Sequence, residues 1–380
     1  MRLRSPVTGA VLARDGHALV APGERWPVID DIAFLRAGRE QLATTALARL
    51  DAGDPAGATA CLLRDRDDWA SGPGPVEADL RRLVAERDRL SFREAMRLLA
   101  FGPVADYLAH RWSDPTFLSG LALADTYWPG HPPRVLEVAC GTGQFLRAFA
   151  PHAAQVTGID VVWSKLWLAR HWVAADATLI CCDAAHDWPL PAGDADLVFC
   201  HDAFYFLPAK PHVAAQMRRC AAPGAVTLVG HAHNALTGNH SSGAPLAPGA
   251  YAALFAPATL FDDVALTAAS ISRTAPEVAD AAALAGAPAI SLAHPAAAPR
   301  AVTGRFDPAA GSLLRLNALY GPATNGRAVA FPSARYAAEY AALATYPQEI
   351  AAELAETAAA DAVDPELVRR RVYVDLPERW

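Results

Sequence analysis

A glycine turn between a β-like run and a helical stretch is the strongest chemical signal in the sequence. RVLEVA, residues 134–139, leads into CGTG and then into the helical stretch QFLRAFA. Gly141 and Gly143 let the backbone turn tightly and approach a ligand, while the first helical turn offers unpaired N–H groups. Dinucleotide sites favour G-x-G-x-x-G, but Leu146 stands at the last position. Glu137 would also bring a carboxylate near two phosphates, so the pattern favours a ligand with a cationic end.

The elements that must position this turn alternate between β-like and helical from Arg134 onward. This alternation indicates a parallel sheet with crossover helices. The fold class that we predict is therefore α/β, with a Rossmann-like sheet. The strand candidates are residues 134–139, 155–160, 178–182, 196–200 and 225–230. Ligands of open parallel sheets bind outside the carboxyl ends of the strands, so the side chains just after these runs are the functional candidates.

E-V-A-C-G-T-G, residues 137–143, resembles the first motif of the class I S-adenosylmethionine-dependent methyltransferases, with Ala139 in place of the first glycine. Further segments follow in the order of that family. Residues 193–207 resemble its fourth strand and the following loop, and residues 217–230 resemble its next helix, Pro-Gly turn and fifth strand. The resemblance covers roughly residues 130–235 and implies S-adenosylmethionine as the cofactor.

The resemblance also implies roles for individual side chains. Asp160 ends the second strand candidate, where the family places the acid that holds the ribose hydroxyls. Asp183 follows the third strand, where the family contacts the adenine amine, and the neighbouring Asp187 is the alternative. Tyr107 and Arg111 would bind the methionine carboxylate, although an arginine on a solvated helix face fits the pattern equally well. The implied cofactor residues are Glu137, Ala139, Gly141, Thr142, Gly143, Asp160, Val161, Asp183, Ala184, His201, Tyr107 and Arg111.

Histidines follow the fourth and fifth strand candidates and suggest base catalysis. His231 and His233 point the same way along an extended chain, and Asp202 arrives from the neighbouring strand to orient one ring. Two adjacent imidazoles depress each other's protonation, which predicts a neutral base. The alternatives are histidines that only tie loops together, or a divalent metal held by H-x-H and the aspartate, and we predict no metal. The predicted substrate contacts are Tyr205, Asn234 and His240.

The composition around these histidines bears on the substrate. Residues 220–261 contain no Asp, Glu, Lys or Arg. Such a stretch is usually buried or lines a pocket, which favours a small or amphiphilic organic acceptor, natural products included, over tRNA or a peptide tail. The formal net charge of −7 and the lack of a long apolar segment argue against wholesale binding to nucleic acid or membranes. The oligomeric state is left open.

The N-terminal segment carries a second resemblance. SPVTGAVLARDGHALVAPGERWPVIDDIAFLR resembles the small zinc-ribbon-like module of the Trm112 type. The four ligand positions would be Ser5, Thr8, Ala21 and Glu24. These residues cannot supply the soft or borderline tetrahedral ligand set that zinc requires, so we predict a metal-free β module held by apolar residues. Modules of that type dock on methyltransferases, so this fusion supports the interpretation of the core.

The length of 380 residues suggests two domains or one large domain with additions. We predict a β module at 1–38, a helical cap at 39–130, a cofactor-binding core at 131–262, and a part at 263–380 that completes the sheet and adds helices. The six cysteines form no C-x-x-C pair and the N-terminus lacks an apolar run, which indicates a cytoplasmic protein.

The function predicted from these patterns is base-assisted methyl transfer from S-adenosylmethionine to a small acceptor. The alternatives are a cofactor-binding enzyme of non-methylating chemistry, an NAD(P)-dependent oxidoreductase and a non-catalytic partner subunit. Toward the C-terminus, the patterns predict helices at 334–346 and 347–362 and strands at 312–320 and 371–376.

Overall fold

A mostly parallel sheet forms the centre of the molecule. The computed structural model describes residues 2–67, 72–238, 243–324 and 326–380. Five parallel strands run in the order β7-β6-β5-β8-β9. Their bounds are β5 (Arg134–Val138), β6 (Gln155–Asp160), β7 (Thr178–Cys181), β8 (Ala195–His201) and β9 (Ala221–His233). All five strand candidates of the parallel core and the α/β fold class are confirmed.

Two further strands extend this sheet beyond β9. β11 (Ala289–His294) pairs antiparallel with β9, and β10 (Thr259–Asp262) pairs antiparallel with β11. Among the described residues, the sheet contains 11 strands, because the N-terminal strands join its other edge. The carboxyl ends of β5 to β9 therefore share one edge, where the predicted site residues lie.

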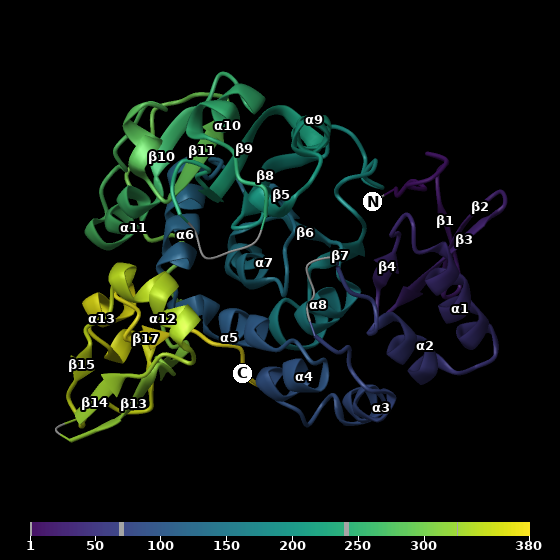
Figure 1. Ribbon diagram of the computed structural model, residues 1–380, viewed down its shortest axis with the longest axis horizontal. Helices are drawn as coiled ribbons and strands as arrows, with labels where there is room; N and C mark the ends of the chain where they lie inside the picture. The colour runs from purple at the N-terminus through teal and green to yellow at the C-terminus, as the bar shows by residue number, and fades with distance from the viewer. Residues whose placement is uncertain (1, 68–71, 239–242, 325) are drawn as a thin grey trace.

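Helices connect and cover the strands (Figure 1). α6 (Pro115–Tyr127) is buried along its whole length, polar residues such as Ser119 and Asp125 included, and it packs against β9 and α11. Phe145, Phe149 and Phe199 fill the space between the strands and the helices. The remaining helices around the sheet are α7 (Gln144–Phe149), α8 (Trp163–Leu168), α9 (Lys210–Cys220), α10 (Pro248–Leu254) and α11 (Asp263–Ser272).

The N-terminal residues form an antiparallel meander that joins the central sheet. Its strands are β1 (Ala13–Asp15), β2 (Ala18–Ala21), β3 (Glu24–Ile29) and β4 (Ile32–Phe34). β4 pairs parallel with β7, in the register Ile32 to Leu179. At the positions matched to metal ligands, the Ser5 hydroxyl donates to Glu24 and accepts the N–H groups of Val7 and Thr8. Hydrogen bonds thus hold together three of the four positions.

A helical segment follows the meander. Its helices before α6 are α1 (Glu40–Asp51), α2 (Pro55–Leu62), α3 (Glu77–Glu86), α4 (Phe92–Leu98) and α5 (Pro103–His110). α4 begins with a capping box, in which Ser91 and Glu94 satisfy each other's backbone N–H groups. The chain turns between α4 and α5 at Ala100 and Gly102, whose φ angles are 54° and 56°. None of the helices in the described ranges is long and apolar enough to cross a membrane.

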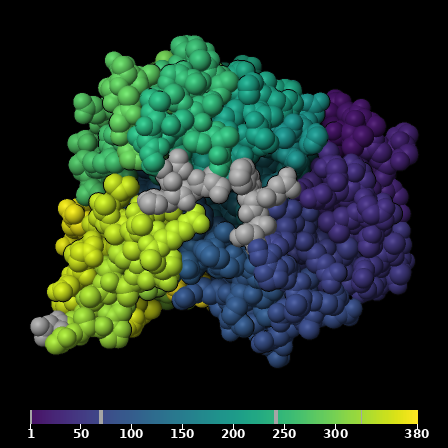
Figure 2. Space-filling model, viewed as in Figure 1, coloured from purple at the N-terminus to yellow at the C-terminus, as the bar shows by residue number. Residues whose placement is uncertain are grey.

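The C-terminal residues build two small sheets of their own. One contains β12 (Leu313–Leu316), β16 (Thr357–Ala359) and β17 (Tyr373–Val374), and the other contains β13 (Tyr320–Ala323), β14 (Gly326–Val329) and β15 (Glu349–Ile350). α12 (Ala334–Tyr340) and α13 (Pro365–Arg369) accompany them. Figure 2 shows this part in yellow, beside the blue helical segment.

The helix predicted for residues 347–362 is wrong. Those residues contain β15 and β16, which pair with β14 and β12 respectively. Their alanine-rich sequence favours a helix locally, but pairing with strands formed elsewhere in the chain overrides that preference. The strands predicted at 312–320 and 371–376 are present, although they lie outside the central sheet.

Candidate functional site

The glycine turn after β5 leaves open space above its backbone. Ala139, Gly141 and Gly143 have φ angles of 54°, 56° and 82°. Among the described residues, a Cβ on Gly141 would meet no atom within 4 Å, whereas a Cβ on Gly143 would lie 3.2 Å from both Ala169 and Ala174. Gly143 therefore lets α7 pack closely, while Gly141 faces the side from which a ligand can approach.

Three acids line the ends of neighbouring strands. Asp160 accepts the N–H of Gly141 at 2.9 Å and the N–H of Val162 at 2.8 Å, so it ties the end of β6 to the glycine turn. Asp183 follows β7 and accepts the N–H of Ala185 at 2.8 Å. Because the strand order is β7-β6-β5, Asp183, Asp160 and Glu137 lie in that order along one edge, with Val161 and the buried Ala184 beside them.

Two buried polar atoms at this edge lack partners. Glu137 Oε2 and Thr142 Oγ1 make no hydrogen bond within the described residues, although both side chains are buried. Burial raises the pKa of Glu137 well above its usual range, and Arg111 only partly offsets this. An unpaired buried polar group is costly, so these atoms fit a polar, cationic ligand end resting on the turn.

The packing of Leu146 separates this turn from a dinucleotide site. Leu146 is fully buried, and its side chain would lie 2.6 Å from a Cβ on Gly158 of β6. In dinucleotide sites, a third glycine on the helix lets the helix and the strand approach closely. Here Gly158 on β6 takes that part, and the helix α7 carries Leu146.

Asp202, at the end of β8, is the centre of a buried polar cluster. Its Oδ2 accepts the Tyr107 hydroxyl at 2.7 Å and Arg111 Nη1 at 2.9 Å, and its Oδ1 accepts the Tyr205 hydroxyl at 2.9 Å. Burial would raise the pKa of Asp202, but His231 and Arg111 lower it to about 2. Tyr107 and Arg111, expected at the methionine carboxylate, are thus bound to a carboxylate of the protein itself.

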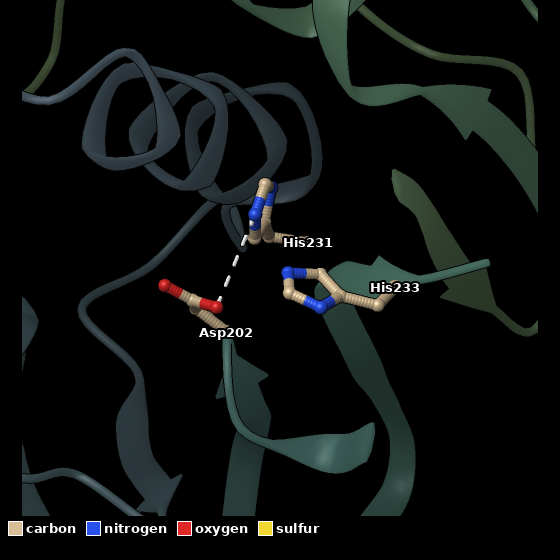
Figure 3. Close-up of side chains that lie close together, drawn as sticks. All are labelled: Asp202, His231 and His233. Atoms are coloured by element: carbon tan, nitrogen blue, oxygen red, sulfur yellow. Dashed lines mark ion pairs between the residues drawn. The ribbon is translucent and has the colours of Figure 1, made fainter. Parts of the chain in front are cut away.

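His231, near the end of β9, pairs with an acid that the sequence analysis did not single out. Its Nδ1 lies 2.7 Å from Asp263 Oδ2, whereas its Nε2 lies 3.9 Å from Asp202 Oδ1 (Figure 3). Asp263 is therefore the acid within hydrogen-bond distance of His231, whereas Asp202 reaches this ring only as a longer ion pair. Ser119 and Ser291 also donate to Asp263, at 2.8 Å and 2.7 Å.

The protonation expected for His231 also needs correction. Burial lowers the pKa of His231, but Asp263 and Asp202 together raise it above its ordinary value. The expectation of a base kept neutral by its neighbouring imidazole is wrong for this residue, because two carboxylates outweigh that effect. The same pairing holds the pKa of Asp263 well below its usual range despite burial.

His233 lies beside His231, but the backbone at His231 is not extended, so the strand alternation from which we expected this does not account for it. The two ring centroids are 5.2 Å apart, and His231 has a φ of 46°. His233 stacks on Tyr205 with ring centroids 3.9 Å apart and planes 10° apart. Asp202, also at positive φ, completes a group whose ligand atoms lie within 4.8 Å of one another (Figure 3). The Arg111 guanidinium on Asp202 works against a divalent cation there.

Two predicted contacts serve the fold instead. His201 Nε2 lies 2.7 Å from the Thr116 carbonyl oxygen, and a Cβ on Gly230 would lie 2.1 Å from its Nδ1, so this ring is enclosed against α6 and β9 and not presented to a cofactor. Asn234 donates to the carbonyl groups of Leu284, Ala285 and Ala287, which corrects its expected role as a substrate contact. His240 lies outside the described residues.

The missed residues follow weaker sequence signals. Asp263 comes directly after the strand β10. An acid that follows an apolar run is the sequence signal that points to it. Tyr336, from α12, donates a hydrogen bond to Asp114, and burial raises the pKa of Asp114 well above its usual range. Nothing in the local sequence links residues so far apart.

Comparisons with known proteins agree with the order of these motifs. Residues 135–224 match a family described as a methyltransferase domain. A ubiquinone biosynthesis O-methyltransferase of Thiobacillus denitrificans is 32% identical over 134 residues, which cover 31% of this chain and 56% of the relative. The chain thus spans a little over half the length of that curated relative.

Two solved structures resemble part of the chain. Phosphoethanolamine N-methyltransferase 2 of Haemonchus contortus, solved with S-adenosyl-L-methionine, is 21% identical, with 39% of this chain and 38% of that chain covered and a TM-score of 0.30. The YcgJ protein of Bacillus subtilis is 16% identical, with 37% and 66% covered and a TM-score of 0.31. Together with the family match, the ordered motifs identify residues 135–224 as a methyltransferase domain of the S-adenosylmethionine-dependent class.

Proposed function

We propose that the whole protein transfers a methyl group from S-adenosylmethionine to a hydroxyl group of a small organic acceptor. The observation that carries this proposal is the buried His231–Asp263 pair, at the strand edge that also holds the glycine turn. The relative that is named as an O-methyltransferase supports the choice of oxygen as the acceptor atom.

The cofactor would lie across the carboxyl ends of β5, β6 and β7. Asp160 retains lone pairs for the ribose hydroxyls, and Asp183 with Ala184 would face the adenine. Glu137 and Thr142 supply the unpaired polar atoms for the methionine part. When bound, this cofactor supplies an electrophilic methyl group on a sulfonium.

His231 would act as the base. In its deprotonated form His231 donates Nδ1–H to Asp263, and the carboxylates that raise its pKa would strengthen Nε2 as the atom that takes the proton of the acceptor hydroxyl. The 3.9 Å between Nε2 and Asp202 exceeds a hydrogen bond and leaves that nitrogen available. The stacked rings of Tyr205 and His233 offer a flat wall, which suits a planar acceptor.

The other parts of the chain have supporting roles in this proposal. Residues 39–130 would cap the acceptor side, and residues 263–380 contribute Asp263. Residues 1–38 would form a Trm112-like module without metal. The net charge of −7 favours a small molecule over nucleic acid. Six unpaired cysteines favour a reducing compartment such as the cytoplasm.

Binding and turnover test the proposal separately. Calorimetry with S-adenosylhomocysteine, NAD and NADP should give binding to the first compound alone. Incubation with labelled S-adenosylmethionine and a panel of phenols and alcohols should then give S-adenosylhomocysteine and a methylated product in equal amounts. Binding of NAD or NADP instead would overturn the cofactor, and acceptor conversion without S-adenosylhomocysteine would favour non-methylating chemistry.

A further inference from the structure

A cavity lies between α6, the end of α11 and the C-terminal residues, away from the glycine turn. It is narrow, with about 20 Å³ of space for the centre of a water-sized sphere. Leu118, Leu121 and Phe306 form apolar walls, and Arg273 and Arg371 bring positive charge. No residue of the proposed methyl-transfer site lines this cavity.

Arg371 is the unusual member of this lining. The residue is only 8% exposed, and its backbone adopts a φ of 62°. Within the described residues its guanidinium has no ion-pair partner, and its Nε has no hydrogen-bond partner. The guanidinium lies over the Phe117 ring, whose centroid is 5.5 Å away. A buried guanidinium without an acceptor is costly unless an anion accompanies it.

The acids around Arg371 are already paired with other arginines. Both oxygens of Asp307 accept Arg273 Nη2, at 2.8 Å and 2.6 Å. Asp375 accepts Arg147 Nη2 at 2.8 Å. Burial lowers the pKa of Arg371 to about 10, so the side chain still carries its charge at neutral pH.

Asp125 also lines the cavity, but it is likewise occupied. It accepts the N–H groups of Thr303 and Gly304 at 2.8 Å and 2.9 Å, and Arg305 lies 3.7 Å from its carboxylate. Asp307 and Asp375 partly offset the charge of Arg371 from a distance, but neither forms an ion pair with it in the described parts of the chain.

We propose that this cavity binds a small monovalent anion on the guanidinium of Arg371. A guanidinium binds such anions through its N–H donors, and the buried Nε–H of Arg371 has no partner among the described residues. The apolar walls suit a halide or the alkyl part of a short carboxylate, and the narrow space excludes a nucleotide.

The cavity shares α6 with the proposed catalytic site. Leu118 lines the cavity, and the next residue, Ser119, donates to Asp263. An anion bound in the cavity should stabilise the folded chain, but it would contact no residue at the cofactor edge. Affinity for S-adenosylhomocysteine should change less than twofold, so this proposal and the proposed function can fail independently.

Thermal unfolding of the full chain tests the anion site. Chloride or acetate would replace gluconate, whose chain is too bulky for the cavity, at constant ionic strength. We expect a rise in Tm that grows with the logarithm of the anion concentration and reaches about 3 °C at concentrations near 100 times Kd. A response to chloride alone identifies a halide site, and a response to acetate alone identifies a carboxylate site.

Arg371→Gln should remove this rise, whereas Arg370→Gln should keep it. Arg370→Gln is the matched control because it removes the same charge one residue away, from an exposed side chain that is paired with Glu366. Equal responses in both variants, or no response in the unaltered protein, would overturn the proposal. If Arg371→Gln fails to fold, crystals of the unaltered protein soaked separately in bromide and in acetate give the answer. Density for either anion beside the guanidinium supports the site, and a cavity that stays empty in both soaks rejects it.

Discussion

His231 Nδ1 lies 2.7 Å from Asp263 Oδ2, although the two residues stand on β9 and α11 and are 32 positions apart. Ser119 and Ser291 hold the same carboxylate, so its position is fixed from three elements. Such a contact orients the imidazole and keeps its far nitrogen available for a proton. The role of His231 as the proposed base can therefore be tested by substituting His231 and Asp263 one at a time.

Asp263→Asn should lower kcat by about 100-fold. It should also move the acid limb of the pH–rate profile to lower pH, because the carboxylate that raises the pKa of His231 is lost. Steady-state rates between pH 5 and 9 check both effects. Asp262→Asn is the control, since Asp262 caps α11 instead and asparagine can cap equally well. A profile that stays in place would reduce Asp263 to a structural role.

His231→Ala and His233→Ala should each lower turnover by about 100-fold or more while affinity for S-adenosylhomocysteine stays within a few-fold. His231 lies 2.7 Å from Asp263, so His231→Ala should also remove the pH dependence that Asp263 controls. Rates and calorimetry on both single variants and on the double variant check this. Unchanged turnover in all three would show that the histidines only hold the loop.

Asp160→Ala should weaken S-adenosylhomocysteine binding by about 1.5–3 kcal/mol, because charge-assisted hydrogen bonds to the ribose would be lost. Asp176→Asn, on an exposed turn, is the control and should bind normally. Calorimetry with equal affinities for the two variants would remove Asp160 from the cofactor site.

The stability of the folded chain in acid should depend on Asp202. Its pKa is lowered to about 2 from 3.8, so the ionised carboxylate contributes stability above pH 3.8 that is lost as the pH falls toward 2. A shift of that size corresponds to about 2 kcal/mol. Asp202→Asn should therefore be less stable than the unaltered protein at pH 6, with the gap narrowing toward pH 2.5. Urea unfolding at several pH values measures this, and a gap independent of pH would contradict it.

Purified protein should carry no stoichiometric zinc that depends on the N-terminal meander. Ser5, Thr8 and Glu24 form hydrogen bonds among themselves or with nearby backbone, and none of them supplies a thiolate. Metal analysis of the full chain checks this. One zinc per chain, lost when residues 1–38 are deleted, would contradict the prediction.

The sequence predicts the parallel core well because its signals are local. Each of the five core strands is a short apolar run bounded by a turn, and the glycine turn needs only a few adjacent residues to be recognised. The positions of Asp160 and Asp183 then follow from the rule that ligands bind at the carboxyl ends of parallel strands.

The contacts that the sequence does not predict join residues far apart. Asp263 reaches His231 only because β10 and β11 fold back beside β9, and Tyr336 reaches Asp114 across 222 positions. The protonation of His231 could not be predicted for the same reason. It depends on two carboxylates from other elements, whereas the local sequence shows only a neighbouring histidine.

The parallel pairing of β4 with β7 sets an order for folding. Ile32 leaves the ribosome about 150 residues before its partner Leu179, so the last strand of the N-terminal meander must wait with an unpaired edge. Until β7 is made, that edge is a template for pairing with another chain. The N-terminal strands are thus synthesised first, but their sheet pairing is completed only when β7 is made. Slow synthesis of residues 35–181 would lengthen the period in which the nascent chain is prone to aggregate.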